Sequence, residues 1–256
     1  MSALATDLAA ALDPGRTFRE AIGADAEPWQ QDVLLSMARR QLLLTARQVG
    51  KSTVTAVAAA QVALYEPASL TLIVSPSQRQ SDETLGKVRV VVGRVASVRG
   101  NSQELRLESG SRVVSLPATE STTRGFSASR LLIFDEAARV PDEVYVGTLP
   151  MVAADGRVIA LSTPGARAGW FHDACSQPQV AGWERHRVTV HESARFSPAR
   201  IAELKAALGD RQFGSEYLCQ FVGLMESAFD PDKVEAAFTS RIRPLYGPGG
   251  LVSCSA

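Results

Sequence analysis

The sequence contains few cysteines, no long apolar run and no excess of charge of either sign. Its three cysteines, Cys175, Cys219 and Cys254, are far apart, so neither a disulfide framework nor a CxxC zinc site is expected, and a reducing compartment is the simplest interpretation. Since no run of about 18 apolar residues occurs, the sequence predicts no membrane-spanning helix and no membrane partner. The alanine-rich N-terminus lacks a basic region before an apolar core, which argues against a signal peptide.

The balance of charge excludes little by itself. Basic and acidic residues number 27 each, so the formal net charge is zero. Proteins that bind nucleic acids often carry a basic excess, so such a role here would depend on a local patch or on assembly into a ring. Hydrophobic residues make up 45% of the 256 residues, which is typical of a globular protein with one sizeable core and a small appended subdomain.

Short apolar runs alternate with helical stretches through most of the chain. The runs span residues 41–45, 70–75, 112–116, 131–135, 157–162 and 185–190. Their nearly continuous hydrophobicity is typical of strands that are buried on both faces, which predicts an α/β fold with a mostly parallel central sheet covered by helices. One segment differs, because residues 104–107 and 112–116 flank Ser109-Gly110 and predict an antiparallel hairpin.

The predicted domain organisation has three parts. Residues 1–25 form an N-terminal helical arm, 26–195 a core, and 196–256 a helical subdomain with a linker-like tail. In the arm, Pro14-Gly15 is expected to break a short helix over 2–13.

Two further helices are expected at the boundaries of the core. The first begins near Pro28 and contains residues 29–40. The second follows Ser197, a capping residue, and ends at Gly209. The tail from Arg241 is rich in Gly, Pro and Ser, which is typical of a linker or an interrupted end.

The strongest motif is TARQVGKST, at residues 45–53, between an apolar run and an Ala/Val-rich helix. Gly50 would let the backbone approach bound phosphates, Lys51 would reach the β- and γ-phosphates, and the Ser52 hydroxyl would hold Mg²⁺. Thr45 stands where the usual pattern has its first glycine. A chance GKST at a helix start is the alternative, but the strand before and the helix after favour nucleotide binding.

A second motif, LLIFDE at residues 131–136, has what a nucleotide loop requires. Its apolar residues put Asp135 at the end of a buried strand, where the carboxylate can hold Mg²⁺. Glu136 follows directly and is placed to activate a water for attack on the γ-phosphate. A buried strand ending in a solvated acidic turn is the alternative. The order of the two motifs favours an ATPase.

These motifs resemble those of the large terminase subunits of tailed bacteriophages, whose loops have the form A-R-Q-x-G-K-S-T with no first glycine. Further segments resemble that family in the same order: Pro28-Trp29-Gln30, Ser75–Gln80, Thr123-Arg124-Gly125, Leu161–Pro164, Glu216–Phe221 and Ala228-Phe229. The resemblance covers about residues 28–230.

The resemblance implies an ASCE-type P-loop ATPase, with ATP and Mg²⁺ as cofactors, that drives double-stranded DNA into a procapsid. It also implies self-association into a ring, a portal protein and a small terminase subunit as partners, and the cytoplasm of an infected bacterial host as location. The residues implied to bind ATP are Gln30, Thr45, Ala46, Arg47, Gln48, Val49, Gly50, Lys51, Ser52 and Thr53.

The resemblance also implies individual roles. Gln30 would read the adenine edge with Trp29 packed nearby, although Trp29 is equally well explained as a core aromatic residue. Arg47 would face the γ-phosphate from within the loop, where a solvated arginine is the alternative. Arg124 would be an arginine finger that reaches the ATP of a neighbouring subunit, and a surface arginine explains it equally well. Whether Arg124 in trans or Arg47 in cis is the finger stays open.

Other candidates carry less. Ser162 and Thr163 would couple hydrolysis to movement by sensing the γ-phosphate, or would form a simple strand-end cap. The three histidines have no metal-ligand spacing and are interpreted as structural. A basic helix face over DNA is conceivable, although a solvated face is the commoner explanation for these residues: Arg79, Lys87, Arg89 and Arg94.

The chain departs from the family pattern in one respect, because large terminases continue into a nuclease domain with an acidic metal cluster. The chain ends at Ala256 with no such cluster after residue 230, so no DNA cleavage is expected. Two alternative functions stay open. One is a helicase-like or remodelling ATPase, which needs a second P-loop-like domain. The other is a nucleotide-dependent assembly module with little turnover, which would not need Glu136.

Overall fold

A computed structural model describes residues 3–119, 125–177, 182–221, 246–247 and 250–251. The contacts within the chain group residues 1–222 into one compact unit and residues 223–256 into a second. In the second unit, β9 (Tyr246–Gly247) and β10 (Gly250–Leu251) pair antiparallel. The domain boundaries at residues 25 and 195 stay predictions.

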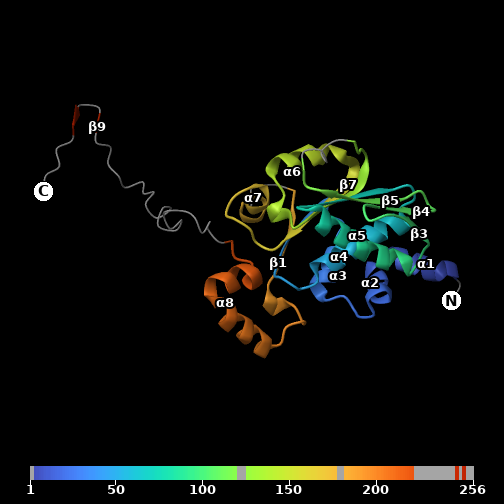
Figure 1. Ribbon diagram of the computed structural model, residues 1–256, viewed down its shortest axis with the longest axis horizontal. Helices are drawn as coiled ribbons and strands as arrows, with labels where there is room; N and C mark the ends of the chain where they lie inside the picture. Colours follow the sequence, from blue (N-terminus) through green and yellow to red (C-terminus); the bar gives the residue numbers. More distant parts are fainter. Residues whose placement is uncertain (1–2, 120–124, 178–181, 222–245, 248–249, 252–256) are drawn as a thin grey trace. The chain divides into compact units, whose positions relative to one another are not determined.

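The first unit is built on an eight-stranded sheet with the order β3-β4-β5-β2-β6-β7-β1-β8 (Figure 1). The pairs from β5 through to β8 are parallel, whereas β3 and β4 join antiparallel at one end. The predicted sheet and hairpin are therefore confirmed. The strands are β1 (Arg40–Thr45), β2 (Leu70–Ser75), β3 (Val98–Gly100), β4 (Glu104–Leu107), β5 (Arg112–Pro117), β6 (Ser129–Asp135), β7 (Val152–Ser162) and β8 (Glu184–Val188).

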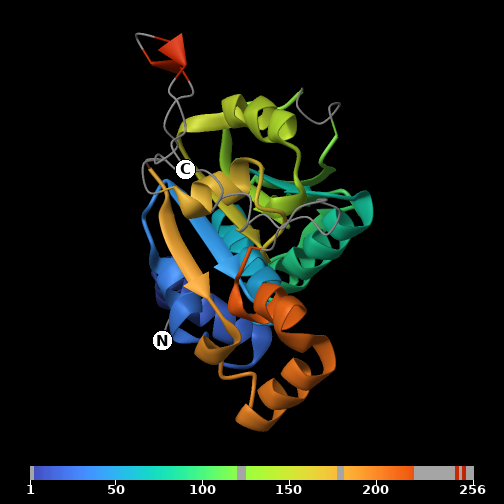
Figure 2. The same ribbon diagram turned by 90° about the vertical axis from the view of Figure 1, so that its left-hand side faces the viewer.

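Helices cover both faces of this sheet (Figures 1 and 2). On one face lie α4 (Lys51–Tyr65) and α5 (Gln78–Gly93), which pack against each other and against β2. On the other lie α6 (Asp142–Thr148) and α7 (Trp170–Ser176). The central strands are almost fully buried between these layers, as their apolar sequences require. No helix in the described part of the chain is both long and apolar enough to cross a membrane.

The N-terminal region differs from the expectation. Pro14 begins a second helix, α2 (Pro14–Ile22), directly after α1 (Ala3–Leu12), instead of ending regular structure. Proline fits the first helical position, where no N–H is needed, and the Asp13 carboxylate accepts a hydrogen bond from the Gly15 N–H at 3.0 Å. Phe18 of α2 is buried, and α2 packs against α4.

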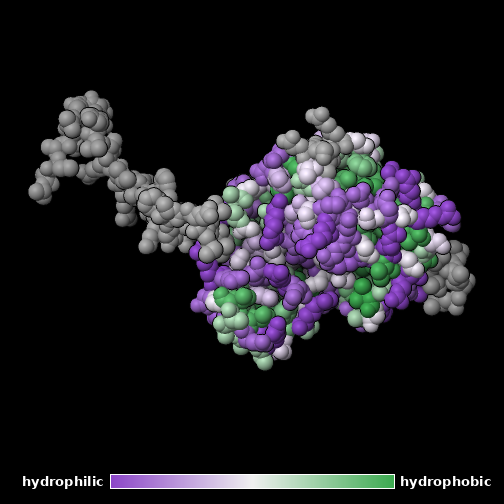
Figure 3. All heavy atoms as spheres, in the orientation of Figure 1, coloured by the Kyte–Doolittle hydropathy of each residue, from purple (hydrophilic) through white to green (hydrophobic). Residues whose placement is uncertain are grey.

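The next helix, α3 (Pro28–Leu35), is shorter than predicted, because β1 already begins at Arg40. The capped helix after Ser197 is confirmed as α8 (Pro198–Leu218), and Gly209, with φ 72° and ψ 166°, interrupts it at the predicted point. A small second hydrophobic cluster of Val190, Phe213 and Tyr217 lies beneath α8. Figure 3 shows hydrophobic residues gathered over this helix, whereas hydrophilic residues cover much of the same face of the molecule.

Candidate functional site

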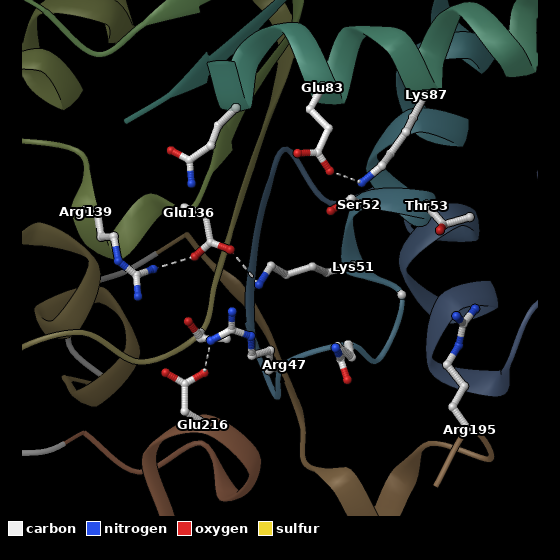
Figure 4. A pocket seen from close by; sticks show the side chains of 14 residues that line it. Arg47, Lys51, Ser52, Thr53, Glu83, Lys87, Glu136, Arg139, Arg195 and Glu216 are labelled. Carbon is white, nitrogen blue, oxygen red and sulfur yellow. Dashed lines mark hydrogen bonds and ion pairs between the residues drawn. The ribbon is translucent and has the colours of Figure 1, made fainter. Parts of the chain in front are cut away.

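A pocket of about 560 Å³ lies where β1, β6 and β7 end. The register aligns these ends, since Leu44 pairs with Ser162 and Asp135 with Leu161. In open α/β sheets, the carboxyl ends of parallel strands are the usual location of ligand sites. Figure 4 shows the side chains that line the pocket: Arg47, Gln48, Gly50, Lys51, Ser52, Thr53, Gln80, Glu83, Lys87, Glu136, Arg139, Thr163, Arg195 and Glu216.

The loop of residues 45–53 connects buried β1 to the N-terminus of α4. Gly50 has φ 98° and precedes the first helical residue, and a Cβ at this position would lie 2.8 Å from Nε2 of Gln30. Both the conformation and the close approach therefore require glycine. The first turn of a helix leaves backbone N–H groups without partners and carries a partial positive charge, so this end of the pocket suits an anion.

Glu136 lies at the centre of a network of ion pairs. Its Oε1 lies 2.7 Å from Nζ of Lys51, and its Oε2 lies 2.6 Å from Nη1 of Arg139 (Figure 4). The Ser162 hydroxyl donates to Oε2 at 3.3 Å. Glu136 adopts φ 53° and ψ 46°, a left-handed conformation that costs a non-glycine residue about 1 kcal/mol. The strand end thus holds the carboxylate in a strained, fixed position.

Two opposing influences set the charge of Glu136. Burial would raise the pKa of its carboxyl, but Lys51, Arg139 and the Ser162 hydroxyl together hold the pKa below its ordinary value. Glu136 is therefore ionised in this arrangement, with both of its oxygens engaged.

The neighbouring carboxyl, Asp135, is more deeply buried. Burial raises its pKa, and so does the charge of Glu136, although a hydrogen bond from Thr84 acts in the opposite direction. The Thr84 hydroxyl, on α5, donates to Oδ2 at 2.6 Å. The other oxygen, Oδ1, is buried and has no hydrogen-bond partner in the described part of the chain. A nearby cation would favour the ionised form of this carboxyl.

Gln30 lies beside the loop, at the start of α3. Its side chain is fully buried, and its Oε1 accepts a hydrogen bond from the Glu27 N–H at 2.9 Å. Its Nε2 has no partner among the residues that the structure describes. Trp29 is also buried, and its Nε1 donates to Oε2 of Glu27 at 3.0 Å. The structure thus brings Gln30 to the phosphate-loop glycine, as the sequence predicted for a nucleotide-binding residue.

Arg47 contacts α8. Its Nη1 lies 3.3 Å from Oε2 of Glu216, and its N–H donates to the Glu216 carbonyl at 2.8 Å. The guanidinium lines the pocket but is mostly exposed. Arg124 falls in residues 120–124, outside the described residues, as do Ala228 and Phe229. The position of the predicted arginine finger therefore stays a prediction.

The conceivable basic face of α5 is divided. Lys87 lines the pocket and pairs with Glu83 at 3.2 Å, whereas Arg89 donates to the carbonyl of Asn101 in the hairpin. Positions two residues apart on a helix differ by about 200°, so Lys87 and Arg89 cannot share one face.

Sequence reasoning missed several residues of this site. Arg139 had a local signal, since it follows Glu136 by three residues in a turn. Thr84, Arg195 and Glu216 had none, because they reach the site only through packing of distant segments.

Comparison with known proteins agrees with this geometry. Residues 42–235 match the model of the family described as "Terminase large subunit, T4likevirus-type, N-terminal". The chain belongs to the terminase large-subunit family. It is 28% identical over 186 residues to the terminase large subunit of Thermus virus P23-45, and 27% identical to that of Thermus phage G20c. Each alignment covers 63% of the chain but 38% of the relative, so the matched region is about two fifths of the relatives' length.

Solved structures confirm the fold of this terminase-family chain. The large terminase ATPase domain of Thermus phage P74-26 matches with a TM-score of 0.71 and 22% identity, over 82% of the chain and all of that domain. The HK97 bacteriophage large terminase matches with a TM-score of 0.69 and 16% identity, over 82% of the chain and 55% of that protein. The large terminase of a thermophilic bacteriophage, solved in complex with ADP, matches with a TM-score of 0.65 and 12% identity, over 77% and 54%.

Proposed function

We propose that the pocket binds Mg-ATP and hydrolyses it, and that the chain is the motor part of a terminase that moves double-stranded DNA into a procapsid. The observation that carries this proposal is the meeting of Lys51, Asp135 and Glu136 at one sheet edge beside the N-terminus of α4. A cation for phosphates, a carboxylate for a metal and a carboxylate for a water are the groups that ATP hydrolysis requires.

Two buried polar atoms support the fit of these ligands. Oδ1 of Asp135 and Nε2 of Gln30 are buried without partners among the described residues. An unsatisfied buried polar group costs about 1–3 kcal/mol, so a ligand that completes both would stabilise this arrangement. A hard cation suits the Asp135 oxygen together with the Ser52 hydroxyl, and a purine edge suits the Gln30 amide. Bound Mg²⁺ would neutralise the charge that develops on the phosphates.

In the proposed reaction, a water oxygen forms a bond to the γ-phosphorus, and the bond from that phosphorus to the bridging oxygen breaks. The products are ADP and inorganic phosphate, and the water proton passes to the Glu136 carboxylate. Glu136 must first leave Lys51, which would pair with the phosphates instead. Arg139 and Ser162 would keep the freed carboxylate in place, because both already bind its other oxygen.

The Thr84 hydroxyl is expected to orient Asp135 toward the metal. Replacing Thr84 with Val removes this hydrogen bond at nearly constant volume and should weaken Mg²⁺-dependent ATP binding by about 10-fold or more. Thr84→Ser should recover most of the loss. Calorimetric titration of ATP over a range of Mg²⁺ concentrations measures both.

The matched control for this prediction is Thr148→Val. Thr148 is also fully buried, but its hydroxyl donates to the Val144 carbonyl on α6. This variant should leave the Mg²⁺ dependence unchanged. An unchanged Mg²⁺ dependence in Thr84→Val would contradict the role of Thr84.

The antiparallel end of the sheet supports a DNA-binding role. Residues 86–117 contain six basic and two acidic residues, although the whole chain has 27 of each. The register places Arg99 directly opposite Arg106, and Arg106 opposite Arg112. Like charges in opposite positions are unfavourable in a sheet, and Glu104 binds two of the three guanidinium groups. An anionic backbone would relieve this repulsion, so we assign DNA phosphates to this arginine row.

The double variant Arg99→Ala/Arg106→Ala tests this assignment. We expect weaker binding of linear duplex DNA irrespective of sequence, and a slope of log K against log salt that is smaller by about 1 for each lost phosphate contact. Fluorescence anisotropy at several salt concentrations gives both quantities. Arg200→Ala, which removes an exposed arginine of α8, is the control and should match the parental protein. Parental affinity and slope in the double variant would rule out this surface.

The remaining partners and roles belong to the same proposal. We propose that subunits form a ring in which Arg124 acts in trans, that a portal protein and a small terminase subunit dock to it, and that the motor works in the host cytoplasm. Ser162 supports a coupling role for the Ser162-Thr163 pair, because its hydroxyl binds Glu136 while Thr163 lines the pocket.

A further inference from the structure

An arginine from outside the recognised motifs lies at one end of the pocket. Arg195 belongs to the segment between the short η4 helix (Val190–Glu192) and α8, and it lines the pocket. Its Nη2 lies 3.0 Å from the position that a Cβ on Gly50 would occupy. Nε2 of Gln30 lies 2.8 Å from that same position. The buried unpartnered amide and the guanidinium thus flank one glycine of the phosphate loop.

The other polar groups fix which end of a nucleotide would meet Arg195. Figure 4 shows Arg195 and Glu136 on opposite sides of the pocket, with Lys51 between them. If the terminal phosphate lies at Lys51 and Glu136, the nucleoside must extend away from Glu136, because the phosphate chain separates the two ends of the molecule. The nucleoside end is therefore the end at which Arg195 and Gln30 lie.

The environment of Arg195 holds it at this position. Its Nε lies 3.3 Å from Oε1 of Glu27, which also accepts a hydrogen bond from the Ser193 hydroxyl at 3.2 Å. Oε2 of Glu27 accepts from Nε1 of Trp29. Glu27 is thus fixed by three donors, and the guanidinium is anchored through its Nε while 44% of the side chain stays exposed. A planar guanidinium of this kind can stack on a base and donate hydrogen bonds to a ribose.

We propose that Arg195 is a nucleoside-binding residue of this pocket, which contacts the base and ribose of ATP, and that Glu27 positions it. This inference rests on the proposed function. It also gives the segment that leads into α8 a direct contact with the nucleotide, at the end of the pocket opposite to the reacting phosphate.

Binding measurements with two probes test the proposal. ATP carries the nucleoside and inorganic tripolyphosphate lacks it, so only ATP affinity should depend on Arg195. We expect Arg195→Ala to weaken ATP binding by about 10-fold and to leave tripolyphosphate binding within about 2-fold of the parental value, as measured by calorimetry with Mg²⁺. Arg200→Ala, five residues further along the chain and exposed, is the matched control and should change neither affinity.

The outcomes separate this inference from the proposed function. If the parental protein binds both probes and Arg195→Ala binds ATP with parental affinity, the nucleoside contact is overturned and the ATP site stands. An equal loss of ATP and tripolyphosphate binding would also overturn it, because Arg195 would then act on the phosphates. If the parental protein binds neither probe, the proposed function and this inference fail together.

Discussion

Glu136→Gln is expected to lower the rate of ATP hydrolysis by about 10²–10⁴-fold while ATP affinity stays the same or increases. The amide keeps the size of the side chain but cannot take a proton from water. It also removes the negative charge that lies 2.7 Å from Lys51, so the ammonium becomes free for the phosphates. Single-turnover phosphate release measures the hydrolysis rate, and calorimetry measures the affinity.

Glu203→Gln is the matched control for this variant. Glu203 loses the same charge in the same substitution but is an exposed residue of α8 that pairs with Arg200. It should hydrolyse ATP at the parental rate. Hydrolysis at the parental rate by Glu136→Gln would remove Glu136 from the chemistry and would favour the assembly module, in which a bound nucleotide is scarcely turned over.

Lys51→Ala is expected to weaken ATP binding by about 100-fold or more. Two effects add in the same direction. The phosphates lose a charge-assisted hydrogen bond, which is worth about 1.5–3 kcal/mol, or about 10- to 100-fold in affinity. In addition, Glu136 keeps only Arg139 as an ion-pair partner, so its carboxylate repels the incoming phosphates. Calorimetric titration gives the affinity, and thermal unfolding checks that the variant is folded.

The double variant Lys51→Ala/Glu136→Gln separates the two effects. If the repulsion exists, removing the carboxylate should restore part of the lost affinity, and the two changes should not be additive. Additive losses would mean that Lys51 and Glu136 do not interact in the free protein. Parental ATP affinity in Lys51→Ala alone would show that the nucleotide binds elsewhere.

The sheet was predictable because its strands are buried on both faces. Runs such as residues 131–135 are too uniformly apolar for an exposed strand, and the acidic pair that follows could be assigned to a strand end. The order of the strands was not predictable in the same way. Nothing local in β1 indicates that it lies between β7 and β8, since all the buried strands have similar apolar sequences.

The candidate site was predictable where a motif is contiguous along the chain. Gly50, Lys51, Asp135 and Glu136 carry local signals, because loop geometry and strand ends are encoded by neighbouring residues. Arg195 carries none, since its place beside Gly50 depends on how the segment before α8 crosses the loop.

The ionic state of the site also lay beyond the sequence. The motifs assign Lys51 to phosphates and Glu136 to water, whereas in the structure the two bind each other. Likewise, Pro14 was interpreted as a helix breaker although Asp13 caps a helix that begins there. In both cases the outcome depends on a partner that a motif does not specify.

The most direct test of ATP hydrolysis in this pocket is the initial rate of phosphate release by the purified chain with ATP and Mg²⁺, alone and with linear duplex DNA. Glu136→Gln, purified in the same way, runs beside it. We expect phosphate release by the parental protein, faster with DNA, and a rate at least about 10²-fold lower in Glu136→Gln. Equal rates in the two proteins, or no release by a parental protein that calorimetry shows to be saturated with ATP, would contradict it.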